Sequence, residues 1–163
     1  MRRNLASFAG LIILLTAVSA SAAGAEGRVC KVLPQFLDKK GRASLSPSLY
    51  ERDAYQFYLR RRPLLREGLR IAVQWKAKHA DWPKLKLRAE LRGLLTNSIQ
   101  TVTLEEPVKK SGFLGNWSDF TITGDKYKEF GDLVAWRVTL LEGDKPLGHL
   151  DSFLWSGVGA QSP

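Results

Sequence analysis

Histidine, aspartate and serine near the C-terminus have the best placement in this chain for nucleophilic chemistry. His149 and Asp151 alternate onto one face of a predicted strand, whereas Ser152 falls on the opposite face. The Gly-x-Ser-x-Gly turn that exposes a nucleophilic serine in α/β-hydrolases does not occur in the chain. A hydrolytic triad is therefore unsupported, and we expect the His149–Asp151 pair to have a surface or structural role.

Other ionisable groups lack the neighbours that catalysis or metal binding requires. His79 has no second ligand at metal-binding spacing. Glu105 and Glu106 are adjacent, so they would point to opposite faces of a strand, and Glu51 and Asp53 do not face each other on a predicted helix. Neither a phosphate-binding glycine loop nor a CxxC pair is present. An active site would have to converge from distant segments, so we predict no enzymatic activity, no cofactor and no metal.

Basic side chains are a second candidate for chemistry, because a row of them can hold an extended polyanion. If two consecutive predicted strands pair, one sheet surface would carry Arg70, Lys76, Lys84, Lys86, Arg88 and Arg92. Glu90 interrupts the row, and charges on a solvent face also prevent aggregation between sheet edges. Binding to envelope polysaccharide, lipid head groups or nucleic acid is thus the alternative functional hypothesis.

One segment repeats apolar residues at helical rather than strand spacing. Ser46 followed by proline can start a helix, and so can Ser48 with Glu51 three residues later, as a capping box. Three arginines crowd the last turn, and Pro63 stops the helix. The signals predict a helix over residues 48–61.

The predicted helix has an unusually wide aromatic face. Tyr50, Ala54, Phe57 and Tyr58 fall on one side, and Tyr55 and Leu59 extend the apolar arc. Such a face either packs against an open edge or end of a sheet, or presents tyrosines to a partner. Tyrosine and arginine are common at interface hot spots. The leading hypothesis is therefore that the chain binds a protein partner in the cell envelope through Tyr50, Tyr55, Tyr58, Arg61 and Arg62.

The rest of the chain alternates apolar and polar residues in short runs separated by turn signals. About seven strands are predicted, at residues 28–34, 69–76, 84–92, 99–104, 117–123, 133–141 and 147–155. We expect a mainly β protein, a single antiparallel β-sandwich with one helix between the first and second strands. A small barrel, or an α+β sheet with the helix on one face, is the main alternative.

The strand count, the core tryptophan Trp75 and the closing hairpin 133–155 make the pattern resemble immunoglobulin-like or fibronectin type III-like sandwiches over residues 28–155. Cys30 is the only cysteine, so the disulfide of antibody domains is excluded. Residues 32–38 and 46–55 also resemble stretches of small exported bacterial proteins of unknown function. That second resemblance implies no activity.

The N-terminus has the pattern of a secretory signal peptide. Arg2 and Arg3 precede an apolar run at 8–18, followed by small residues that offer cleavage sites near residues 22 and 25. An uncleaved anchor and a twin-arginine signal are the alternatives. We predict a cleaved segment 1–25, export to the periplasm or medium, and no transmembrane segment in the mature chain.

The mature chain is long enough for one domain with one core, predicted at 26–155 and followed by a disordered tail at 156–163. Without the two N-terminal arginines, 23 basic residues face 16 acidic ones, a balance that favours anionic partners. With one cysteine the domain has no internal disulfide and depends on its core. We expect Cys30 to be a small buried hydrophobe.

Overall fold

The structure, a computed structural model, describes residues 24–109 and 116–156. Strands make up most of it, so the prediction of a mainly β protein is confirmed. All but two residues of the predicted signal peptide, 1–25, lie outside the described residues. The predicted tail, 156–163, also lies outside them except for its first residue.

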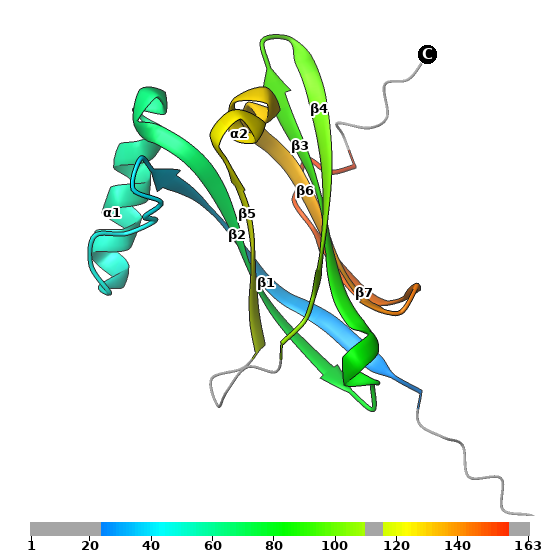
Figure 1. The fold of residues 1–163 in the computed structure, drawn as a ribbon. Helices are drawn as coiled ribbons and strands as arrows, with labels where there is room; N and C mark the ends of the chain where they lie inside the picture. The colour runs from blue at the N-terminus through cyan, green and yellow to red at the C-terminus, as the bar shows by residue number, and fades with distance from the viewer. Residues whose placement is uncertain (1–23, 110–115, 157–163) are drawn as a thin grey trace, which may run out of the picture.

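Two antiparallel sheets form the body of the protein (Figure 1). The first sheet has the order β1-β2-β5, with bounds Glu26–Asp38, Arg66–Lys78 and Asn116–Thr123. The second has the order β4-β3-β6-β7, with bounds Ser98–Pro107, Leu85–Leu95, Asp132–Glu142 and Lys145–Asp151. Strands β2 and β3 therefore belong to different sheets, although they follow each other in the chain.

The helical segments connect strands and lie outside the sheets. Helix α1 (Leu49–Arg60) lies between β1 and β2 in the chain and flanks the end of β1 at one side of the molecule (Figure 1). Helix α2 (Gly124–Phe130) joins β5 to β6, and single 3-10 turns occupy Pro63–Leu65 and Trp82–Lys84. Within residues 24–109 and 116–156, neither α-helix has the length and apolar character needed to cross a membrane.

The core takes apolar side chains from both sheets. In β2 the predicted inward set, Leu69, Ile71, Val73 and Trp75, is at most 1% exposed. The second sheet contributes a matching row at the same period of two, namely Leu85, Leu87, Ala89, Leu91, Val138 and Leu140. Burying these side chains is the main driving force for folding, and each contributes about 1–3 kcal/mol.

Strand β1 is longer than the predicted strand 28–34. It passes through Pro34, which has no backbone N–H to donate. The proline is tolerated because β1 is an edge strand, so no neighbouring strand needs that donor. A register shift lies between Val29 and Lys31, and Cys30 at that shift is half-buried rather than buried as predicted. The β pattern alone does not reveal such an irregularity.

The C-terminal strand is shorter than predicted, because β7 ends at Asp151. The backbone N–H of Ser152 bonds to the carbonyl of Trp136, and the chain then turns. Trp155 packs on the outer face of the second sheet, with the guanidinium of Arg92 3.9 Å from its ring centre and that of Arg137 at 5.2 Å. Trp155 is thus a buried side chain beneath two cations rather than the last residue of the predicted strand 147–155.

Gly93 in β3 lies where the end of α2 crosses the strand. A Cβ atom at this position would collide with the carbonyl oxygen of Phe130. Gly93→Ala should therefore lower the free energy of unfolding by about 1–3 kcal/mol, measured by urea denaturation. Thr103→Ala, at an exposed position of the adjacent strand, should change it by less than about 0.5 kcal/mol. Equal stability of the two variants would contradict the close approach.

Candidate functional site

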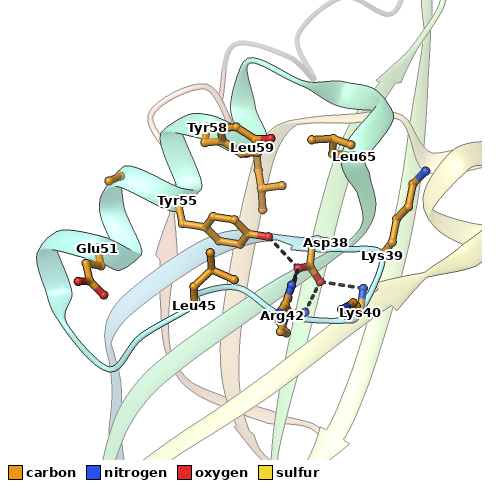
Figure 2. Close-up of a pocket in the computed structure, with 11 residues that line it drawn as sticks. Asp38, Lys39, Lys40, Arg42, Leu45, Glu51, Tyr55, Tyr58, Leu59 and Leu65 are labelled. Carbon is orange, nitrogen blue, oxygen red and sulfur yellow. Dashed lines mark hydrogen bonds and ion pairs between the residues drawn. The ribbon is translucent and has the colours of Figure 1, made fainter.

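Asp38, at the end of β1, anchors the region around α1 (Figure 2). Its Oδ1 accepts hydrogen bonds from the backbone N–H groups of Lys40 at 2.8 Å and Arg42 at 2.9 Å. Its Oδ2 accepts one from the Tyr55 hydroxyl at 2.7 Å and one from Arg42 Nε at 2.9 Å. The carboxylate thus closes the loop after β1 and ties it to the helix.

These contacts change the acidity of the groups involved. Burial by itself raises the pKa of the Asp38 carboxyl, but the hydrogen bonds from Arg42, Tyr55 and Lys40 outweigh it and hold the pKa well below its usual range. Burial and the hydrogen bond to Asp38 together raise the pKa of Tyr55. Asp38 is therefore a charged structural anchor and Tyr55 a neutral donor at neutral pH.

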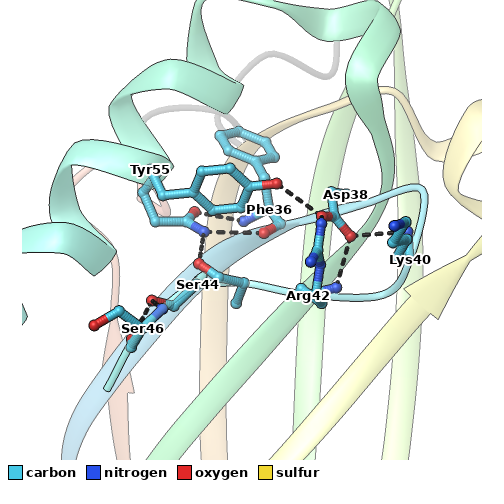
Figure 3. A network of polar contacts seen from close by, with 9 residues as sticks. Phe36, Asp38, Lys40, Arg42, Ser44, Ser46 and Tyr55 are labelled. Carbon is cyan, nitrogen blue, oxygen red and sulfur yellow. Dashed lines mark hydrogen bonds and ion pairs between the residues drawn. The ribbon is translucent and has the colours of Figure 1, made fainter. Parts of the chain in front are cut away.

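Gln56 joins the middle of α1 to the free edge of β1 at Phe36. Figure 3 shows Phe36 and the loop after β1 within this network of polar contacts. Its Oε1 accepts the backbone N–H of Phe36 at 2.8 Å, and its Nε2 donates to the Phe36 carbonyl at 3.0 Å and to the Ala43 carbonyl at 2.7 Å. The side-chain amide therefore bonds to the strand edge as a neighbouring strand would. Leu59, one turn further along, is fully buried beside it.

Arg66 caps the C-terminal end of α1. Its side chain is only 5% exposed, and it donates to the carbonyls of Leu59 and Arg60. The same guanidinium pairs with Asp132 at 2.7 Å and lies 4.1 Å from the ring centre of Phe36. Arg66 thus adds side-chain donors at the helix end, where the Leu59 carbonyl also accepts the backbone N–H of Arg62.

The start of α1 differs from the predicted capping box. Ser48 is the N-cap residue, but its side chain makes no capping hydrogen bond. The Ser46 hydroxyl instead accepts the backbone N–H of Ser48, and the Ser44 hydroxyl bonds to the Ser46 backbone. A run of serine turns thus takes the place of the capping box.

The docked side of α1 leaves its aromatic side in solvent. Tyr50 is 84% exposed, Phe57 58% and Tyr58 41%, and Ala54 between them is exposed as well. Leu64, just after the helix, is 89% exposed. The alternative that the aromatic side of α1 packs against a sheet edge is therefore wrong for these residues. The opposite side of the helix, which carries Gln56, lies against the edge of β1 instead.

The five predicted partner-binding residues divide into two groups. Tyr55 is half-buried, and its hydroxyl is engaged by Asp38. The other four are exposed, and three of them take part in ordered cation–ring pairs. Arg62 lies 4.1 Å from the Tyr58 ring centre, and Arg61 lies 5.1 Å from the ring centre of Phe57. The Tyr55 and Tyr58 rings stack with centres 6.0 Å apart. We call the exposed set of Tyr50, Ala54, Phe57, Tyr58, Arg61 and Arg62 the aromatic face.

A pocket of about 620 Å³ lies between α1 and the loop after β1 (Figure 2). Its walls are mainly apolar and come from Leu45, Ala54, Tyr55, Tyr58, Leu59 and Leu65. Lys39, Lys40 and Arg42 lie on one side of it and Glu51 on the helix side. Sequence reasoning missed this pocket, because the loop and the helix come together only in the folded chain, through the Asp38–Tyr55 bond and the bond from Gln56 to the Ala43 carbonyl.

The six residues of the basic row do not share a sheet surface. Arg70 and Lys76 are on β2 in the first sheet, whereas Lys86, Arg88 and Arg92 are on β3 in the second, preceded by Lys84. The predicted pairing of the two strands is wrong, since each sheet has its own order.

Several of the basic groups also have partners of their own. Lys84 pairs with Asp81, and Lys86 and Arg88 both pair with Glu105. Hydrogen bonding to Glu105 raises the pKa of Lys86. The charged groups therefore solvate one face of the second sheet, and the ion pairs with Glu105 cross-link β3 to β4.

The residues considered for catalysis have other contacts. Arg137 holds the Asp151 carboxylate through two hydrogen bonds, of 2.9 and 2.7 Å. The Ser152 hydroxyl accepts the backbone N–H of Trp136, and His149 is exposed. Among the described residues, no three His, Cys, Asp or Glu side chains are grouped so as to hold a metal ion.

Comparison with protein-family models, with curated proteins and with solved structures found no match for this chain. The functional argument therefore depends on the geometry of the region around α1.

Asp38 provides a test of the anchor. Asp38→Asn should lower the free energy of unfolding at pH 7 by about 1–3 kcal/mol, because buried donors lose their anionic acceptor. Since folding lowers the pKa of Asp38, its contribution is present above about pH 4 and is lost as the pH falls through the folded value. The difference between the proteins in urea denaturation should therefore shrink below about pH 4. Asp53→Asn, an exposed change on α1, serves as the control; a difference independent of pH would contradict the assignment.

Proposed function

We propose that the protein is an exported, non-enzymatic module that binds another envelope or secreted protein through the aromatic face and the adjoining loops. The observation that carries this proposal is the exposure of three aromatic side chains on a helix whose opposite side is fixed to the protein. Exposed apolar patches of this kind mark sites of association.

The rigidity of α1 favours binding. Gln56, Leu59 and Arg66 hold the helix at its middle and its end, so few degrees of freedom remain to be lost on association. The stacked Arg62–Tyr58 pair and the Arg61–Phe57 pair are also ordered before a partner arrives. Rigid aromatic and arginine side chains are the residue types that dominate interface energies.

Charge indicates the chemistry of the partner. Arg60, Arg61 and Arg62 are all exposed at the end of the helix beside the aromatic face. A partner surface that combines apolar side chains with carboxylates would complement both features. The basic row has no comparable support, since its members are distributed over two sheets.

The finer architecture supports the same picture. We infer that the two sheets form a sandwich of the immunoglobulin-like or fibronectin type III-like kind. The core cluster that draws on both sheets, with Trp75 fully buried in it, supports this inference. The signal-peptide pattern at the N-terminus supports export. In sandwiches of this kind, recognition commonly uses segments at the ends of the strands, and α1 follows the end of β1.

Site-specific photocrosslinking in the native envelope tests the proposal. A benzophenone residue at Phe57 should give a discrete crosslink to one protein, whereas the same group at Trp117, a half-exposed aromatic on β5, should not. The captured protein, once purified, should bind Tyr50→Ala at least about tenfold more weakly. The Tyr50→Ala variant should keep the wild-type melting temperature, because the residue makes no core contact.

Two results would contradict the proposal. Equal crosslinking from Phe57 and Trp117 would mean that the aromatic face is not the site of partner binding. Binding to an anionic polymer that is steeply salt-dependent and lost on charge reversal at Lys86 and Arg88 would favour the polyanion alternative.

A further inference from the structure

The pocket between α1 and the loop after β1 has the size and lining of a small-molecule site. Its volume of about 620 Å³ is within the range of about 300–1,000 Å³ common for such sites. Leu59 and the half-buried Leu65 lie deepest, and Leu45 and Tyr58 form opposite, more exposed walls. An occupant would therefore contact apolar surface along most of its length.

The two ends of the pocket differ in charge. Figure 2 shows Lys39 and Lys40 at one end and Glu51 at the other, with Tyr55 between them. Within the described residues, the ammonium groups of Lys39 and Lys40 have no ion-pair partner, and both residues are exposed. Glu51 would repel an anionic group at its own end, so a ligand with one anionic head would bind in a single direction.

Asp38 does not cancel the charge of the basic end. Its carboxylate is paired with Arg42 at 2.8 Å and accepts further hydrogen bonds from Lys40, Arg42 and Tyr55. The Arg42 side chain is still 46% exposed. A ligand head group therefore meets two lysines and the outer side of a guanidinium.

We propose that this pocket binds a long-chain carboxylate, with the acyl chain between Leu45, Tyr58 and Leu65 and the carboxylate at Lys39 and Lys40. Burial of an acyl chain supplies affinity at about 0.8 kcal/mol per methylene. The lysines supply orientation and selection against neutral or cationic amphiphiles of the same length. The proposal goes beyond the proposed protein-binding function and does not depend on it, since only Ala54 and Tyr58 of the pocket lining belong to the aromatic face.

Calorimetric titration of the purified protein with laurate, below the concentration at which laurate forms micelles, tests the proposal. Laurate should bind with one site per chain, and dodecyltrimethylammonium, which has the same tail and the opposite charge, should bind at least about tenfold more weakly. Ala54→Trp, which adds a ring to the pocket wall without removing a contact of the core, should abolish binding.

Charge reversal tests the head-group end. Lys39→Glu with Lys40→Glu should weaken laurate binding about tenfold or more at low salt, and less at high salt. Lys76→Glu with Lys78→Glu makes the same change in net charge on exposed positions of β2 and should have little effect. Circular dichroism and the melting temperature verify that each variant folds. Leu45→Asp, at an exposed position of the pocket wall, takes the place of any variant that does not fold.

The outcomes separate this proposal from the protein-binding function. Tyr50→Ala should reduce partner binding and leave laurate binding unchanged. Undetectable laurate binding, binding that survives Ala54→Trp, or equal losses in the two charge-reversal pairs would each overturn the proposal. Preference for dodecyl phosphate with no laurate binding would do so as well, because the head group would then be wrong.

Discussion

The buried guanidinium of Arg66 is the interaction on which the arrangement of the α1 region depends. A buried charge is costly unless all of its donors are satisfied. Arg66 finds its partners on three separate elements, namely the end of α1, the Phe36 ring of β1 and Asp132 at the start of β6. These elements must therefore come together in one geometry, which couples the helix to both sheets.

A second set of contacts determines which side of α1 faces outward. Gln56 bonds to the edge of β1 in the middle of the helix, and Tyr55 bonds to Asp38 beside it. Together with Arg66 at the end, they fix the rotation of the helix about its axis. The aromatic face is then exposed because the opposite face makes the hydrogen bonds, and the pocket beside Tyr55 forms where the loop follows Asp38.

Period-two patterns predicted which face of β2 and which face of β3 are buried, because each strand packs one face into the core. Leu69 to Trp75 and Leu85 to Leu91 are the clearest examples. The pattern does not contain the identity of the neighbouring strand, since every strand that buries one face has the same alternation. The short connection that contains Trp82–Lys84 carries the chain from one sheet to the other, so the two strands that it joins do not pair. For that reason the six predicted basic residues do not share one sheet surface.

The orientation of α1 shows why apolar periodicity alone was not enough to predict the site. A ranking by hydrophobicity places the tyrosines and Phe57 against the sheet and Gln56 in solvent. The free edge of β1, however, presents a backbone N–H and carbonyl at Phe36, and leaving these groups buried without partners would cost about 1–3 kcal/mol each. A glutamine amide supplies one donor and one acceptor in the matching geometry, which an aromatic ring does not. The side of α1 that carries Gln56 therefore docks, and the surface left exposed is the one that hydrophobicity would have buried.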